Sequence, residues 1–288
     1  MRSSFNQKPS PAPAPTQVHV SEVERGPWGR VVKRVRAVDA WRRVSLSAAL
    51  YGGLSCTITP MLGHKRVSQW AMRRWFVSIC TDLGIGRELR NGVGLEAQRP
   101  CVFVANHLSL LDTVLIGSFM TGDYRWLAKE DVFKVPIIGH HLRCSGHIPV
   151  YRGTKRGSNV GLPEQIHQVV AEGASLLFYP EGTRSRDGRL QAFKMGAFIA
   201  AVEEALPVVP LVVEGTDQLL RKGEWAPDLA RNVVCRLTVL PPQWAPAAGD
   251  ARARAEALRD AVRAAMLAQL GGEDGQAAAA RHAMKAAP

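Results

Sequence analysis

The sequence lacks the features of a secreted, disulfide-bonded protein. Its 288 residues include only five cysteines, and no two of them form a Cys-x-x-Cys pair. Several lie inside apolar runs, so we expect reduced, buried thiols, which suits a protein that faces the cytoplasm. No apolar segment precedes the proline-rich run Pro9–Pro15. A signal peptide is therefore not expected, and residues 1–26 are predicted to be a disordered proline-rich tail.

Acidic residues are few relative to basic ones. The 25 Asp and Glu against 37 Lys and Arg give a net charge of +12 and a pI near 10.0. This balance favours an anionic partner, such as a membrane surface, a phosphorylated substrate, an acidic carrier protein or nucleic acid. Because no nucleic-acid recognition motif is present, we expect no nucleic-acid partner. A Gly-x-Ser-x-Gly elbow is also missing, which argues against a serine-hydrolase relay.

Charge is absent from Val44 to Gly63, a run of 20 residues with basic clusters on both sides. This length matches a bilayer span, but glycines, hydroxyl residues and a proline inside the run weaken it as one. The basic flanks assign no orientation. We therefore expect a hairpin that enters one leaflet, followed by an amphipathic interfacial helix over residues 67–83. A soluble two-helix cap packed on the core is the alternative.

The rest of the chain alternates strand and helix patterns, which predicts an α/β fold. We expect a mostly parallel sheet flanked by helices, with an N-terminal membrane-associated helix pair. The predicted strands are 101–105, 124–128, 148–151, 175–179, 208–213 and 233–240, and the predicted helices are 162–172, 193–205 and 251–270. Pro149 places its strand near an edge of the sheet. Residues 84–99 are expected to be a loop.

These patterns divide the chain into five regions. After the tail of residues 1–26, residues 27–95 form a basic membrane-associated helical region, and residues 96–245 form the α/β domain. Residues 246–270 are the C-terminal helix, and residues 271–288 are a disordered tail because they contain no apolar pattern that could build a core.

The segment from Asn106 to Asp112 follows a short apolar strand, the usual place for reacting groups in α/β proteins. Ser109 and Asp112 also form a helix-start signature, with serine at the N-cap. A continuous helix would place His107 and Asp112 about 140° apart, so the turn before the cap must bring them together. Such a pair forms a general base, in which the carboxylate orients the imidazole. The alternative is a purely structural role, with Asp112 capping its helix.

A second group of polar residues leaves another predicted strand at Pro180. Gly182 permits a tight turn with exposed N–H groups, and Thr183, Arg184 and Ser185 supply further donors, which suits a phosphate or carboxylate. It is not a P-loop, because the Gly-Lys-Ser/Thr ending is absent. An ordinary charged surface turn is the alternative. A third group, His140, His141, Cys144 and His147, has no second ligand cluster, so we expect no metal site there.

Four ordered motifs in this sequence resemble those of the glycerolipid acyltransferases, in particular the lysophosphatidic acid acyltransferase group. They are Asn106-His107-(x4)-Asp112, Gly146…Val150-Tyr151-Arg152, Phe178-Tyr179-Pro180-Glu181-Gly182-Thr183-Arg184-Ser185 and Val209-Pro210-Leu211. The resemblance covers about residues 100–216. The second motif departs from the family pattern, since Tyr151 stands where the family usually has an acidic or similar residue, and Pro149 is unusual.

The resemblance implies an O-acyltransferase of the 1-acylglycerol-3-phosphate type. It implies His107 as the general base and Asp112 as its orienting carboxylate. It implies that the acceptor is bound by Asn106, Arg152, Glu181, Gly182, Thr183 and Arg184, and that Pro210 lies near the acyl donor. No cofactor is expected; the co-substrate would be acyl-CoA or acyl-carrier protein, and the lysophospholipid acceptor would reside in an anionic membrane, at the cytoplasmic face of the inner membrane.

Other functions stay open at this point. Within the acyltransferases, the acceptor could be another lysolipid, such as lyso-ornithine lipid, which lacks the glycerol phosphate. Outside them, a non-catalytic lipid-binding protein with the same fold would not need His107. A basic nucleic-acid-binding protein would account for the charge alone.

Overall fold

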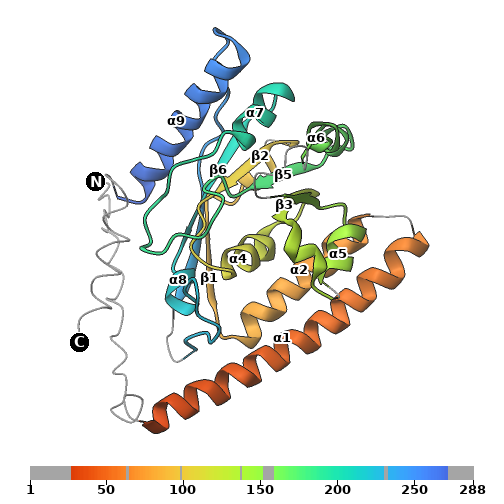
Figure 1. Ribbon diagram of the computed structural model, residues 1–288, viewed down its shortest axis with the longest axis vertical. Helices are drawn as coiled ribbons and strands as arrows, with labels where there is room; N and C mark the ends of the chain where they lie inside the picture. Colours follow the sequence, from red (N-terminus) through yellow and green to blue (C-terminus); the bar gives the residue numbers. More distant parts are fainter. Residues whose placement is uncertain are drawn as a thin grey trace, which may run out of the picture.

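Seven strands form one sheet in the part of the chain that the structure describes, with helices on both faces (Figure 1). The structure is a computed structural model, and it describes residues 27–62, 65–97, 99–136, 138–151, 159–229 and 233–271. The strand order is β1-β7-β6-β2-β5-β3-β4. Neighbouring strands are parallel except β6 and β7, which are antiparallel. The predicted mostly parallel α/β sheet is therefore confirmed. The two predicted terminal tails fall outside the described residues, apart from Gly271.

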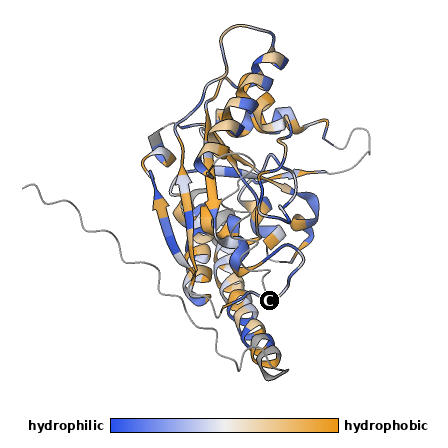
Figure 2. Ribbon diagram, turned by 90° about the vertical axis from the view of Figure 1, so that its left-hand side faces the viewer, coloured by the Kyte–Doolittle hydropathy of each residue, from blue (hydrophilic) through white to orange (hydrophobic). Residues whose placement is uncertain are grey.

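Each strand predicted from the sequence is present within one or two residues of its expected ends. The strands are β1 (Gly86–Arg90), β2 (Val102–Ala105), β3 (Tyr124–Lys129), β4 (Ile148–Val150), β5 (Ser175–Phe178), β6 (Val208–Glu214) and β7 (Val234–Val239). As expected from Pro149, β4 lies at an edge. The strand β1 was not predicted, because residues 84–99 were taken as a loop. Its charged sequence has no apolar run, since it lies at the opposite edge and pairs only with β7. Figure 2 shows this edge carrying hydrophilic residues beside hydrophobic inner strands.

The helices form two layers on the sheet and a third outside one of them. They are α1 (Pro27–Leu62), α2 (Lys65–Asp82), α3 (Gly94–Ala97), α4 (Leu111–Phe119), α5 (Ile138–Cys144), α6 (Leu162–Ala171), α7 (Gly196–Glu203), α8 (Thr216–Leu219) and α9 (Ala251–Gln269), with a 3₁₀ turn at Glu130–Lys134. On one face α2 and α4 cover Phe103, Leu177 and Leu211. On the other, α6, α7 and α9 cover Val102, Leu176 and Val212. The alternation along each strand is the period of two that a sheet buried on both faces requires.

The predicted domain boundaries do not match the packing at two places. Strand β1 lies in the region predicted to be membrane-associated, yet it belongs to the sheet. Helix α9 packs on the same core as β6 and α7, with Leu258, Val262 and Met266 fully buried. The sheet and both of its helical layers therefore form one folding unit from α2 to α9.

The N-terminal helices differ from the predicted leaflet hairpin at residues 44–63. Instead of forming a hairpin within this run, α1 continues from Pro27 to Leu62, and α2 runs back along it (Figure 1). Helix α2 is part of the core, since Met72, Phe76 and Ile79 are buried against α4 and the sheet. This agrees with the alternative of a two-helix cap. Within the described residues, no helix is both long and apolar enough to cross a bilayer. Membrane association of these helices stays a proposal.

Gly117 of α4 lies in close contact with Phe76 of α2. A Cβ atom at this position would overlap the ring of Phe76, and it would also meet the Tyr124 hydroxyl at 3.1 Å. We therefore expect Gly117→Ala to lower the free energy of unfolding by about 1–3 kcal/mol, because an overpacked helix contact outweighs the better helix propensity of alanine.

Gly53 is the matched control, since it lies inside α1 and a Cβ there would meet nothing within 4 Å. Gly53→Ala should raise the free energy of unfolding by about 0.5–1 kcal/mol, because glycine is unfavourable inside a helix. Urea unfolding measures both changes. A destabilising Gly53→Ala would contradict a continuous α1.

Candidate active site

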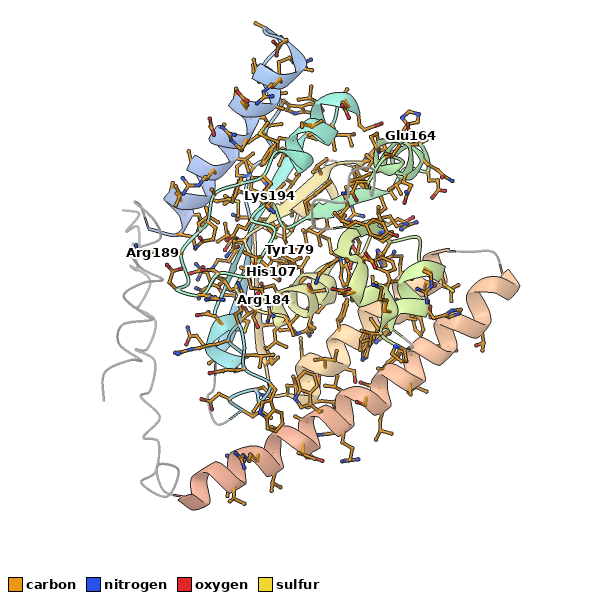
Figure 3. The ribbon with its side chains drawn as sticks, in the orientation of Figure 1. His107, Glu164, Tyr179, Arg184, Arg189 and Lys194 are labelled. Carbon is orange, nitrogen blue, oxygen red and sulfur yellow. The ribbon has the colours of Figure 1, made fainter. Side chains whose placement is uncertain are left out.

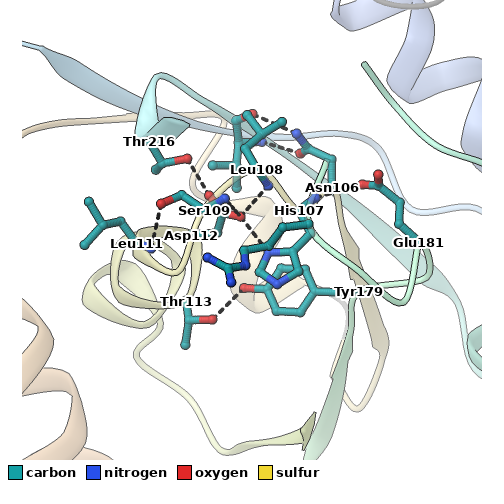
Figure 4. A network of polar contacts seen from close by, with 12 residues as sticks. Asn106, His107, Leu108, Ser109, Leu111, Asp112, Thr113, Tyr179, Glu181 and Thr216 are labelled. Atoms are coloured by element: carbon teal, nitrogen blue, oxygen red, sulfur yellow. Dashed lines mark hydrogen bonds and ion pairs between the residues drawn. The ribbon is translucent and has the colours of Figure 1, made fainter. Parts of the chain in front are cut away.

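His107 and Asp112 meet at the carboxyl end of β2, as the sequence predicted. The imidazole Nδ1 lies 2.7 Å from Asp112 Oδ2 (Figure 4). Asp112 is fully buried, whereas 15% of the His107 side chain is exposed. Asp112 is at the start of α4, and the turn formed by Leu108–Leu110 closes the distance that a continuous helix would leave open. The pair therefore has the geometry of an oriented histidine with one accessible edge.

The carboxylate of Asp112 is held entirely by hydrogen-bond donors. Besides the imidazole, Oδ2 accepts the backbone N–H groups of Leu108 at 2.6 Å and Ser109 at 2.8 Å, and Oδ1 accepts the Thr216 hydroxyl. A carboxylate that accepts from this many donors is the ionised form. The hydrogen on His107 therefore sits on Nδ1, where it donates to Asp112, and Nε2 carries the lone pair that can accept a proton.

Ser109 does not cap α4 in the predicted way. The helix begins at Leu111, and its N-cap residue is Leu110, with no side-chain hydrogen bond at the cap. Ser109 is buried; its hydroxyl donates to the carbonyl of Leu220 at 2.6 Å and accepts the Leu111 N–H at 3.2 Å. The carboxylate expected to help start the helix folds back onto the preceding turn instead. The helix-start signature therefore marked the turn that holds His107 against Asp112.

The Tyr179 ring stacks on the imidazole of His107, a contact that the sequence analysis did not identify. The ring centroids are 4.1 Å apart, and the Tyr179 hydroxyl is 3.0 Å from Thr113 Oγ1. Burial, together with the charge of Asp112, raises the pKa of Tyr179 well above its ordinary value. The tyrosine thus stays neutral and fixes the ring plane of His107. Its position at the end of a predicted strand was the one available signal.

Glu181 has a structural role that differs from the predicted acceptor contact. The side chain is 5% exposed, with Oε1 accepting the His107 N–H at 2.8 Å and Oε2 accepting the Gln191 N–H at 3.1 Å. Burial raises its pKa to about 7, although the two N–H donors act in the opposite direction. Both carboxylate oxygens are therefore occupied by backbone groups, and Glu181 joins the His107 segment to the loop before α7.

Two further predicted residues also face the protein interior. The Asn106 side chain accepts the Val213 N–H at 2.7 Å and donates to the Val213 carbonyl at 2.9 Å, so it extends the pairing of β2 with β6. Pro210 is buried within β6, opposite Val104 of β2. It lines neither of the cavities described below. The structure therefore places Asn106 and Pro210 in the sheet, and their contact with substrate stays a prediction.

The predicted turn of residues 182–185, called the arginine turn below, lies beside His107. Gly182 has a φ of +71°, which favours glycine, and its N–H closes a tight turn onto the Tyr179 carbonyl at 3.0 Å. The Ser185 N–H donates to the His107 carbonyl at 2.7 Å. Arg184 is half-buried, and Figure 3 places its label next to that of His107. Arg152, the other predicted phosphate ligand, lies outside the described residues.

Two cavities border this site. One, of about 350 Å³, lies at the carboxyl ends of β3, β4 and β5, and its lining combines apolar residues with Tyr151, Tyr179, Gly182, Lys129 and Lys194. The Lys129 ammonium forms an ion pair with Asp131. The other, of about 170 Å³, is apolar and lies between α1, α2 and α4. It is lined on the α4 side by Leu110 and Leu111, which belong to the same turn as His107 and Asp112. The site thus has a cationic side and an apolar side.

The histidines that resembled metal ligands have other partners. His141 bonds to the Ser55 hydroxyl at 2.7 Å, and His147 Nδ1 accepts the Trp126 N–H at 2.9 Å. Burial lowers the pKa of His141 to about 4 and holds that of His147 well below its ordinary value. Across the described residues, no cluster of three or more His, Cys, Asp or Glu is arranged to hold a metal ion.

Comparison with known proteins shows what this chain is similar to. Residues 87–214 match the family model described as Acyltransferase. A chloroplastic 1-acyl-sn-glycerol-3-phosphate acyltransferase of Brassica napus is 40% identical over 134 residues, which is 45% of this chain and 38% of that protein. A human 1-acyl-sn-glycerol-3-phosphate acyltransferase beta is 29% identical over 187 residues, 63% of this chain and 67% of that protein.

A solved structure shares the fold. The crystal structure of the 1-acyl-sn-glycerophosphate (LPA) acyltransferase PlsC from Thermotoga maritima aligns with a TM-score of 0.67 at 19% identity. The alignment covers 85% of this chain and all of that one. The matches to the Brassica relative and to one from Arabidopsis thaliana span only 38% and 37% of their lengths.

Residues 87–214 therefore match the Acyltransferase family model, and the solved structure shares the fold of this chain. The resemblance to the lysophosphatidic acid acyltransferase group is confirmed, because these relatives all carry that name.

Proposed function

We propose that this protein transfers a fatty acyl group from a thioester to the free hydroxyl of 1-acyl-sn-glycerol-3-phosphate, which yields phosphatidic acid for phospholipid biosynthesis. The observation that carries this proposal is the 2.7 Å contact of His107 Nδ1 with a buried, fully bonded Asp112. It leaves Nε2 as a base at an accessible edge of the ring. The names of the relatives support the acceptor.

The chemistry needs one base and no cofactor. The acceptor hydroxyl gives its proton to His107 Nε2 while its oxygen attacks the thioester carbonyl, and Asp112 stabilises the imidazolium that forms. The tetrahedral intermediate then releases the thiol, which takes the proton from Nε2. A thioester has a good leaving group, so no covalent acyl-enzyme is required. The donor is acyl-CoA or acyl-carrier protein.

The two sides of the site suit the two ends of a lysophospholipid. Arg184 and the lysines of the larger cavity, Lys129 and Lys194, supply positive charge for the acceptor phosphate. Arg152, outside the described residues, follows Tyr151 at the edge of the same cavity and is proposed to assist. The apolar cavity beside Leu110 and Leu111 can receive part of an acyl chain.

We also propose that α1 rests on an anionic membrane, at the cytoplasmic face of the cell membrane. Several large apolar side chains of α1 are exposed on one side at helical spacing: Val31, Val35, Val38 and Leu46. Basic residues lie among and beside them, including Arg34 and Arg42. An apolar stripe flanked by positive charge is the pattern of an interfacial helix.

His107→Ala should abolish acyl transfer while the fold stays intact, because the base is lost and the side chain is partly exposed. Asp112→Asn should lower the rate by about 10²–10⁴-fold, since it disturbs the orientation of a base that is still present. Steady-state turnover of the purified variants measures both effects. His167→Ala is the matched control, because His167 is exposed on α6 and pairs with Glu204. Unchanged turnover in His107→Ala would refute the mechanism and favour a non-catalytic lipid-binding protein.

Arg184→Lys should raise the KM for lysophosphatidic acid about tenfold, which corresponds to about 1.4 kcal/mol. Lysine cannot reproduce the two-pronged hydrogen bonding of a guanidinium to phosphate. The KM for the acyl donor should stay nearly constant. Arg186→Lys, on an exposed neighbouring residue, is the control. Titration of lyso-ornithine lipid in parallel, with Arg152→Lys included, tests the other acceptor. Equal increases in KM for both acceptors would show that the arginines do not bind the acceptor phosphate.

In flotation assays the protein should rise with anionic vesicles at low salt and be partly released at high salt. Each basic residue near the surface contributes about 1 kcal/mol, and salt at physiological strength screens it within about 8 Å. Val38→Glu should weaken binding, whereas Val160→Glu, at a position that is even more exposed but outside the N-terminal helices, should not. Stronger binding to duplex DNA than to vesicles at equal salt would favour the nucleic-acid alternative.

A further inference from the structure

The segment that follows β6 contacts the site at several points, although it lies after all four family motifs. It comprises α8 and residues 220–228. The Thr216 hydroxyl donates to Asp112, and the Leu220 carbonyl accepts the Ser109 hydroxyl at 2.6 Å. Farther along, the Trp225 carbonyl accepts the Trp41 indole N–H of α1 at 2.7 Å. Both ends of the segment are thus fixed, one to the catalytic turn and one to α1.

Between these fixed points, Lys222 reaches the arginine turn. Its Nζ donates to Thr183 Oγ1 at 2.9 Å and to the Arg184 carbonyl at 2.8 Å. The two acceptors belong to consecutive residues of the turn. The residue after them, Ser185, donates its N–H to the His107 carbonyl. The turn is therefore held on one side by the strand that carries the base and on the other by the Lys222 ammonium.

The arginine turn needs such a support because its own backbone hydrogen bonds hold its two ends but not Thr183 and Arg184 between them. Gly182 closes the turn onto Tyr179, and Ser185 anchors its far end. For Thr183 and Arg184, no other hydrogen bond of a side chain is found within the described part of the chain. The Arg184 carbonyl fixes the direction in which the Arg184 side chain leaves the backbone. An arginine has many rotamers, so a fixed backbone reduces the ordering that phosphate binding requires.

We propose that Lys222 is a positioning residue for the acceptor, and that it acts by fixing the Thr183–Arg184 backbone so that Arg184 faces His107. The proposal rests on the proposed function, because it assigns Arg184 to the acceptor phosphate. Lys222 itself makes no contact with the phosphate in this arrangement, since its ammonium is engaged by the turn. The acceptor site then depends on a residue far from the family motifs in sequence.

Lys222→Met tests this role, because it keeps the apolar stem and removes the donors. The KM for lysophosphatidic acid should rise about tenfold with kcat within about twofold, as expected when binding alone is lost. Lys222→Arg should restore most of the affinity, since a guanidinium can donate to both oxygens. Arg221→Met, the neighbouring cation on the same segment, should behave as wild type.

A double-mutant cycle separates positioning from direct binding. If Lys222 acts through Arg184, adding Lys222→Met to Arg184→Lys should raise KM by less than about twofold, because the residues work as one unit. If the two effects multiply, Lys222 contacts the phosphate itself and the proposal is overturned. If Lys222→Met does not fold, Thr183→Val takes its place, since it removes one acceptor and should raise KM in the same direction.

Trypsin provides a readout that does not depend on activity. Cleavage after Arg184, followed by mass spectrometry in the full-length protein, should be several-fold faster in Lys222→Met than in wild type or Arg221→Met, because a released turn fits a protease better. Unchanged cleavage together with unchanged KM would overturn the proposal. If wild type does not acylate lysophosphatidic acid, the proposed function fails. Unchanged cleavage would separately refute the proposal that Lys222 fixes the Thr183–Arg184 backbone.

Discussion

The buried carboxylate of Asp112 is the constraint on which the site depends. A fully buried charge is costly unless donors surround it, and here they come from the imidazole, two backbone N–H groups and the Thr216 hydroxyl. These donors belong to the turn after β2 and to the segment after β6. The requirement to satisfy one carboxylate therefore fixes two strand ends relative to each other and sets the tautomer of His107.

The parallel sheet brings the remaining groups to the same edge. Strands β2, β5 and β6 are neighbours, so the segments leaving their carboxyl ends converge. The turn after β5 contributes Tyr179 under the imidazole and Glu181 behind its backbone. Asn106 ties β2 to β6 just where the strands end. The polar residues of the motifs thus divide into those that reach the cavity and those that hold the backbone.

The N-terminal helices connect the catalytic domain to the surface we propose it uses. Helix α2 is a core element, whereas α1 lies outside it and exposes apolar side chains. The apolar cavity lies between them and α4, and the Trp41 indole bonds to the segment that also carries Lys222. Contacts of residues 216–228 therefore join the exposed surface of α1, the apolar cavity and the arginine turn.

The sequence by itself determined the α/β class, nearly every strand, the edge position of β4, and the His107–Asp112 pair with its nearby arginine turn. These follow from local patterns, since apolar periodicity and strand ends are properties of consecutive residues. It missed β1, whose edge position leaves no apolar run, and it predicted a leaflet hairpin in residues 44–63, where α1 packs against α2 and stays helical to Leu62. Only the tertiary structure decided that Asn106 and Glu181 bond to backbone groups and that Tyr179 stacks on the imidazole. It also decided that Thr216 and Lys222 join the site. These contacts join residues up to 107 positions apart, and such pairings are set by how strands are ordered in the sheet, which no local pattern encodes.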